Sequence, residues 1–145
     1  MSEVNRVVIP AAGWGTRFLP ATKAVPKEML PLVDQPIIHY GVEEASASGI
    51  RQVIIVTSQG KEAMEDYFLP DPELETFLKA RGRASLLANI RELSSNIQIS
   101  YVMQKEQLGL GHAILIAENA VGPGPFAVLL PDDVIRSQRP VLAQM

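Results

Sequence analysis

An α/β fold, with a mostly parallel sheet between two layers of helices, is predicted by the order of elements in these 145 residues. Four apolar, β-branched runs alternate with segments of helical periodicity, as in repeated strand–helix–strand units. Polar and glycine-rich stretches follow several of the runs, where ligands bind in such sheets. The sequence therefore predicts a three-layer αβα arrangement with its functional groups at one sheet edge.

The individual elements follow from local patterns. Continuous or alternating apolar residues predict the strands, and turn residues bound them. The first long helix is expected to use Asp34 as its cap, Pro36 in its first turn and Gly49 as its end. Gly82 is expected to divide the longest helical segment. The predicted strands are 6–10, 51–58, 96–103 and 125–131, and the predicted helices are 34–49, 60–68, 71–93 and 111–120.

Composition excludes several classes of protein. The net charge is −3 and the sequence pI is about 5.4, so a globally basic nucleic-acid binder is not expected. The absence of cysteine excludes disulfides, zinc–thiolate sites and thiol nucleophiles. The sequence has neither a long apolar run nor a signal-peptide pattern, so we expect no membrane partner and a cytoplasmic location.

The stretch AAGWGTR, residues 11–17, follows the first predicted strand. Glycines there allow backbone N–H groups to converge on phosphate oxygens, although a simple tight turn is the alternative. The GxGxxG pattern fails because Phe18 replaces its third glycine, and the Walker pattern is absent. Pro20 also prevents an immediate long helix, so a dinucleotide-binding dehydrogenase domain is not favoured.

A proline-rich arm follows this loop and carries cations. Arg17 can grip a polyphosphate with its planar guanidinium, and a lysine supplies a compact charge. Lys27 lies in VPKEMLP, where prolines restrict the backbone and apolar neighbours can anchor it. Lys23 is equally expected to be a solvated surface lysine. The arm therefore predicts a polyphosphate site that includes Arg17 and Lys27.

The run AAGWGTRFLPATKAVPKEMLPLVDQPIIHY resembles the sugar-1-phosphate nucleotidylyltransferase family, whose wider pattern is GxGTRxxP followed by PKxxLP. ATKAVPKEML is similar to the uridylyl-transferring branch. The resemblance continues through TSQGKEAMEDYF, GLGHAILIAENAV and FAVLLPDDVI, so it covers essentially the whole chain. It implies a Rossmann-like αβα fold, here incomplete, of the kind that binds nucleotide-diphospho-sugars.

The resemblance also implies roles for particular residues. Arg17 and Lys27 would be catalytic, Asp132 would hold Mg²⁺, and His39 and His112 would be structural or solvated. Gln104 and Gly109 would contact the pyrimidine base, and Ala12 with Gly13 would offer backbone to the base and ribose. The implied nucleotide-binding residues are Ala11, Ala12, Gly13, Gly15, Thr16, Arg17, Lys27, Gln104 and Gly109.

The implied reaction transfers UMP from UTP to glucose 1-phosphate, giving UDP-glucose and pyrophosphate. It requires Mg²⁺ and no nucleophile from the protein. Family members run to roughly twice this length, so residues 1–145 are expected to be the N-terminal nucleotide-binding part of one domain, inactive by itself. The full-length protein is expected to be a homo-oligomer. A thymidylyltransferase and a non-catalytic nucleotide-binding or regulatory relative remain alternatives.

Overall fold

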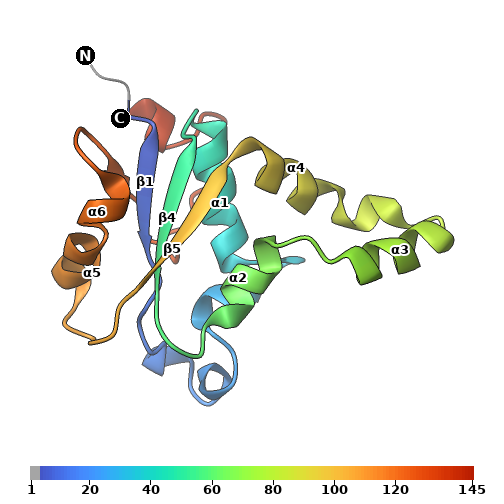
Figure 1. Ribbon diagram of the computed structural model, residues 1–145, viewed down its shortest axis with the longest axis horizontal. Coiled ribbons are helices and arrows are strands. Elements are labelled where there is room, and N and C mark those ends of the chain that lie inside the picture. The colour runs from blue at the N-terminus through green and yellow to red at the C-terminus, as the bar shows by residue number, and fades with distance from the viewer. Residues whose placement is uncertain (1–3) are drawn as a thin grey trace.

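The computed structural model describes residues 4–145 and contains a four-stranded parallel sheet (Figure 1). The strand order is β5-β4-β1-β6, so the first strand of the chain lies inside the sheet. Val7 of β1 pairs with Val53 on one side and with Ala127 on the other. The predicted α/β class is confirmed. The strands are β1 (Arg6–Pro10), β4 (Gln52–Thr57), β5 (Gln98–Met103) and β6 (Ala127–Val128).

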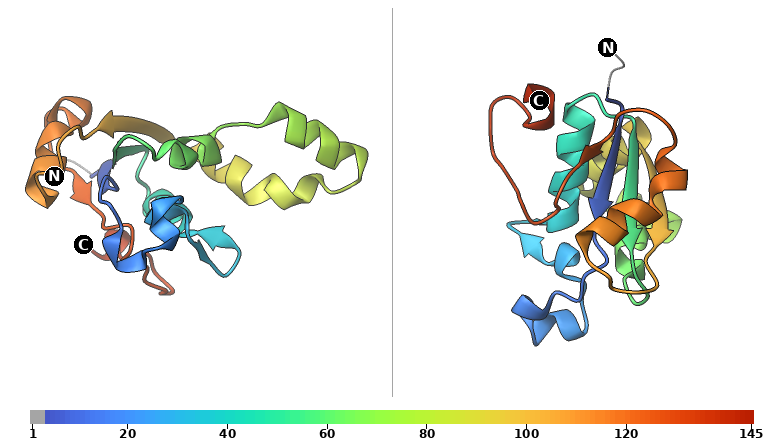
Figure 2. Two further views of the ribbon diagram at one scale, coloured as in Figure 1. Left: turned by 90° about the horizontal axis from the view of Figure 1, so that it is seen from below. Right: turned by 90° about the vertical axis from the view of Figure 1, so that its left-hand side faces the viewer.

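Helices cover both faces of the sheet, as Figure 2 shows from two further directions. Alternate residues of β1 supply the two cores: Val7 and Ile9 face one side, and Val8 faces the other. Buried strand residues that are apolar on both faces are typical of parallel sheets. The first face is covered by α1 (Ile37–Ala47), α2 (Glu62–Phe68) and α4 (Ala88–Asn96), and the second by α5 (Leu110–Ile116) and α6 (Glu118–Val121).

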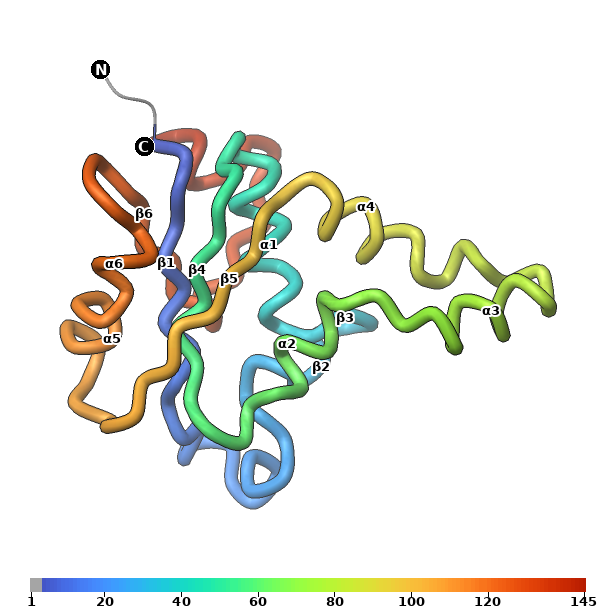
Figure 3. The backbone as a smooth tube through the Cα atoms, viewed as in Figure 1, coloured from blue at the N-terminus to red at the C-terminus, as the bar shows by residue number. Residues whose placement is uncertain are grey.

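A pair of helical segments projects from the sheet on the side of β5, and Figure 3 traces its backbone. The first segment is α3 (Pro72–Ala80), and the second is the short 3₁₀ turn η4 (Ala84–Leu87) continued by α4. Asp71 caps α3 by accepting a hydrogen bond of 2.9 Å from the Leu74 amide. Gly82 has φ +67° between the two pieces, so the predicted break is confirmed. Within residues 4–145, we find no helix with the length and apolarity that a membrane span requires.

The chain between β1 and α1 contains short turns and a hairpin. The proline-rich arm contains no long helix, as its prolines predicted, and has three 3₁₀ turns instead: η1 (Thr16–Phe18), η2 (Ala21–Lys23) and η3 (Lys27–Met29). The prediction that Asp34 caps the following helix was wrong. Asp34 lies in the turn of a small hairpin, β2 (Pro31–Leu32) with β3 (Gln35–Pro36), and α1 begins at Ile37.

Other boundaries also differ from prediction; for example, α4 continues to Asn96 and β5 begins only at Gln98. The predicted strand 125–131 is regular over β6 alone, although the Leu129 amide still donates a 3.0 Å hydrogen bond to the Val8 carbonyl. The predicted helix 111–120 is divided at Ala117 into α5 and α6. A final 3₁₀ turn, η5 (Leu142–Gln144), lies near α1, where the Leu142 amide donates to Glu44. These differences leave the order of the main sheet unchanged.

Candidate functional site

The predicted site residues follow the carboxyl ends of three different strands. Ala12 follows β1, Gln104 follows β5 and Asp132 follows β6. Because parallel strands end at the same sheet edge, these segments, distant in sequence, come to one side of the molecule. The sequence prediction that functional groups gather at this edge is therefore consistent with the topology.

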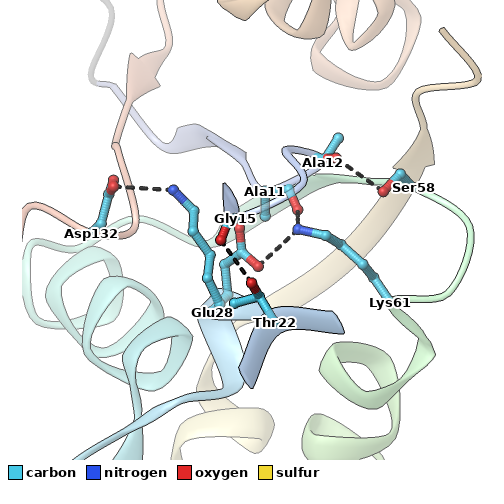
Figure 4. Close-up of polar contacts among 9 residues, drawn as sticks. Ala11, Ala12, Gly15, Thr22, Glu28, Ser58, Lys61 and Asp132 are labelled. Atoms are coloured by element: carbon cyan, nitrogen blue, oxygen red, sulfur yellow. Dashed lines mark hydrogen bonds and ion pairs between the residues drawn. The ribbon is translucent and has the colours of Figure 1, made fainter. Parts of the chain in front are cut away.

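The glycine loop and the cationic arm are interlocked at Gly15. Gly15 has φ +63°, and a Cβ atom placed there would lie 3.1 Å from both Lys27 Cβ and Thr22 Cγ2. Thr22 Oγ1 also donates a 2.7 Å hydrogen bond to the Gly15 carbonyl (Figure 4). Glycine is thus required at position 15 both by backbone conformation and by close packing. Gly13, by contrast, has open space around it.

Lys27 and Asp132 meet although 105 residues separate them. The Lys27 Nζ–Asp132 Oδ2 distance is 3.1 Å. Partial burial alone would raise the pKa of Asp132. The hydrogen bond from Lys27, the backbone amide of Asp132 and the charges of Lys27 and Arg17 outweigh that effect and hold this pKa below its ordinary value. Asp132 is therefore an ionised carboxylate beside two cations at neutral pH.

This arrangement gives Asp132 a small, pH-dependent effect on stability. The ionised side chain favours the folded state above the ordinary carboxyl pKa, and this contribution is lost as the pH falls through the lowered folded pKa. We expect Asp132→Asn to decrease the free energy of unfolding by less than about 1 kcal/mol at pH 7, because the pair is partly exposed. Urea denaturation at pH 7 and at a pH below the lowered folded pKa of Asp132 measures this. A difference between the two proteins that persists at the lower pH would contradict the assignment.

Gln104 is buried rather than exposed in a loop. Its backbone amide donates a 2.8 Å hydrogen bond to the Thr57 carbonyl. Its Nε2 lies 2.9 Å from His112 Nδ1 and 3.4 Å from the Gly109 carbonyl oxygen, and Gly109 has φ +94°. His112 therefore orients the Gln104 amide, a role that the sequence did not suggest. These two side chains and the Gly109 turn form one unit at the end of β5.

Three polar residues that the sequence analysis did not select support the loop. Lys61 Nζ donates to the Ala11 carbonyl at 2.6 Å and to Glu28 Oε2 at 2.8 Å. Ser58 Oγ donates to the Ala12 carbonyl at 3.0 Å (Figure 4). Burial lowers the pKa of Lys61, and the charge and hydrogen bond of Glu28 oppose this effect. The sequence signal was weak: Glu28 lies beside Lys27 in PKEML, where it resembles a solvated acid.

The remaining predicted positions differ in exposure. Ala11 and Ala12 are buried, so they can offer backbone groups only, whereas Gly13, Thr16 and Arg17 are exposed. Trp14 is 76% exposed and does not belong to the core. His39 is buried with its Nδ1 3.0 Å from the Tyr67 hydroxyl, which fits the predicted structural role.

Comparison with known proteins decides the family. The family model described as nucleotidyl transferase matches residues 6–145. The chain belongs to the nucleotidyl transferase family. This membership confirms the resemblance inferred from the glycine loop and the PKEML segment.

Individual proteins similar to this chain support the same family assignment. A UTP–glucose-1-phosphate uridylyltransferase of Bacillus subtilis (strain 168) is 52% identical over all 145 residues, which cover 50% of that protein. An apo UDP-glucose pyrophosphorylase crystal structure matches with TM-score 0.91 and 46% identity, over 98% of this chain and 53% of that one. A UTP-bound enzyme from Acinetobacter baumannii matches with TM-score 0.93 and 44% identity, over 99% and 51%. The chain thus spans about half the length of the relatives it matches.

Proposed function

We propose that this chain forms the UTP-binding part of a UTP–glucose-1-phosphate uridylyltransferase. The observation that carries the proposal is the Lys27–Asp132 contact of 3.1 Å beside the glycine loop. It joins a candidate phosphate-binding cation to a candidate metal-binding carboxylate. The names of the similar proteins, one of them UTP-bound, supply the nucleotide and the sugar phosphate as candidate substrates.

The glycine loop and the arm are suited to a triphosphate. Gly15 adopts the left-handed conformation in which successive amides can converge on an anion. Thr16 and Arg17 follow it directly, and both are exposed to an incoming ligand. Lys27 Cβ lies beside Gly15, and the Lys27 ammonium group contacts Asp132. We assign the β- and γ-phosphates to Gly15, Thr16 and Arg17, and the α-phosphate to Lys27.

The end of β5 is suited to the base. With Nε2 engaged by His112 and the Gly109 carbonyl, the Gln104 side chain has its Oε1 left to accept a hydrogen bond from the uracil N–H. Gln104 is held by His112 and by the Gly109 turn, so its orientation is set before the base arrives. Ala12 and Gly13, at the end of β1, would present backbone groups to the base and ribose. This division places base and phosphates along the same sheet edge.

Asp132 fits the role of a Mg²⁺ ligand. Magnesium prefers carboxylate oxygens and commonly keeps water and substrate phosphates as its other ligands. Asp132 is ionised, and its side chain is 47% exposed. Among residues 4–145 no group of three or more acidic or histidine side chains is gathered, so Asp132 would supply one ligand and the phosphates others. Bound there, the ion would neutralise charge on the phosphate oxygens.

The residues described act by orientation and charge. An oxygen of the glucose 1-phosphate phosphoryl group attacks the α-phosphorus of UTP, the bond to the β-phosphate oxygen breaks, and pyrophosphate leaves. Lys27 and Arg17 stabilise the negative charge that builds on the non-bridging and departing oxygens. Holding the triphosphate in line with the attacking oxygen supplies the remaining contribution. The proposed chemistry requires no nucleophilic side chain.

Titration of UTP with Mg²⁺ into this chain and into Arg17→Ala tests the proposal. We expect the variant to bind about 10-fold more weakly, because one charge-assisted contact is lost from an exposed position. Isothermal calorimetry gives both affinities, and Lys79→Met on α3 is the matched loss of an exposed cation away from the site. Equal affinity in wild type and Arg17→Ala would remove the phosphate role assigned to that arginine.

A further inference from the structure

A buried ammonium group connects the base of the glycine loop to the Lys27 segment. Lys61 Nζ reaches the Ala11 carbonyl, 50 residues away in sequence, and the Glu28 carboxylate, 33 residues away. The three residues belong to β1's continuation, to η3 and to the start of α2. Figure 4 shows the lysine entering between the other two segments. One side chain thus joins three parts of the chain.

Lys61 and Glu28 form an ion pair that is almost completely buried. The side chains of Lys61 and Glu28 are 9% and 0% exposed. Desolvation of two charges offsets most of their attraction, so a buried ion pair contributes little net stability compared with apolar residues. We therefore expect the Lys61–Glu28 pair to act mainly by fixing the relative positions of the segments that it joins.

The joined segments carry the proposed phosphate contacts. Glu28 directly follows Lys27 in η3, and Lys27 Cβ lies against Gly15. Fixing Glu28 therefore fixes the backbone from which the Lys27 side chain extends. Ser58 lies, like Lys61, in the connection between β4 and α2, and it donates a hydrogen bond to the Ala12 carbonyl. The start of the glycine loop and the segment that carries Lys27 are thus both bound to the connection between β4 and α2.

We propose that Lys61 and Glu28 are positioning residues that hold Lys27 against the glycine loop before nucleotide binds. The pair does not touch the substrate; it acts through Ala11 and Lys27. The inference rests on the proposed function for the identity of the ligand, but its structural part can be measured without nucleotide.

Amide hydrogen exchange in the nucleotide-free chain tests the structural part. The variants are Lys61→Met, the double variant Lys61→Met with Glu28→Leu, and Lys79→Met as the exposed control. We expect exchange in residues 11–18 and 26–31 to be about 10-fold faster in both Lys61 variants, because the hydrogen bonds from the ammonium are gone. The double variant should recover the unfolding midpoint that the single variant loses, since its buried carboxylate is no longer left unpaired.

Wild-type exchange in both segments of the folded double variant would overturn the proposal. Failure of both Lys61 variants to fold would also overturn it, because the pair would then be a requirement of the whole fold. Titration with UTP and Mg²⁺ adds the functional readout: the double variant should bind about 10-fold more weakly than Lys79→Met. Faster exchange with unchanged affinity would refute the positioning role. Absence of UTP binding by wild type would refute the proposed function, while the exchange result would still decide what the pair does.

Discussion

Replacing Lys27 with Met should weaken binding of UTP with Mg²⁺ by about 100-fold, the range for a charge-assisted contact in a preorganised site. The Lys27 side chain is 23% exposed and its position is fixed by Gly15 and Glu28, so little entropy is lost when it meets a phosphate. Its removal also deprives the Asp132 carboxylate of its ion-pair partner. Calorimetric titration of the variant measures the loss.

Stability provides the control for this variant. The Lys27–Asp132 pair is partly exposed, so we expect Lys27→Met to change the free energy of unfolding by less than about 1 kcal/mol. Weak binding by a well-folded variant would then reflect the site itself. Wild-type affinity in Lys27→Met would show that this lysine does not bind phosphate, and a Lys79→Met protein that binds as weakly would show that overall charge is responsible.

Gly15→Ala should decrease the free energy of unfolding by about 2 kcal/mol, through the left-handed backbone conformation and the crowding of a new methyl group. The two neighbouring atoms at 3.1 Å belong to Lys27 and Thr22, so these side chains must shift by a few tenths of an ångström to admit it. UTP affinity should fall with stability, because the same movement displaces Lys27. Urea denaturation followed by circular dichroism gives the free energy.

Substitutions at two other glycines distinguish the cost of the backbone conformation from the cost of crowding. Gly13 has open space and no positive φ, so Gly13→Ala should change stability by less than about 0.5 kcal/mol. Gly60 has φ +82° with nothing within 4 Å, so Gly60→Ala reports the conformational cost alone. Gly15→Ala should be the most destabilising of the three. If it is no worse than Gly60→Ala, the close packing of Gly15 against Lys27 and Thr22 adds nothing to the conformational cost.

Much of the fold was predictable because its signals are local. The run RVVIP is buried on both faces of a parallel sheet, and such a strand is continuously apolar wherever it occurs. Pro20 and Pro26 excluded a long helix by their covalent geometry, and 3₁₀ turns occupy that region. Asp71 and Gly82 likewise marked a helix start and a break. These predictions needed no knowledge of distant contacts.

The errors and omissions concern contacts that the local helix and strand patterns do not encode. Asp34 has the chemistry of a helix cap, but the pairing of Pro31 with Pro36 places it in a hairpin turn instead. Glu28 and Lys61 look like surface charges in sequence, and the fold alone shows that they are buried against each other. His112 was expected to be structural or solvated, and its contact with Gln104 is a structural one whose partner the sequence did not identify. Local patterns cannot reveal partners 33 residues apart.

The central claim is that the glycine loop, Lys27 and Asp132 form one site for a metal-bound triphosphate. Crystals grown with UTP and Mn²⁺, which substitutes for Mg²⁺ and scatters anomalously, test it most directly. We predict an anomalous peak beside the Asp132 carboxylate and a triphosphate contacting Arg17, Lys27 and the Gly15 backbone. Nucleotide density elsewhere on the molecule, or a metal bound away from Asp132, would contradict the account.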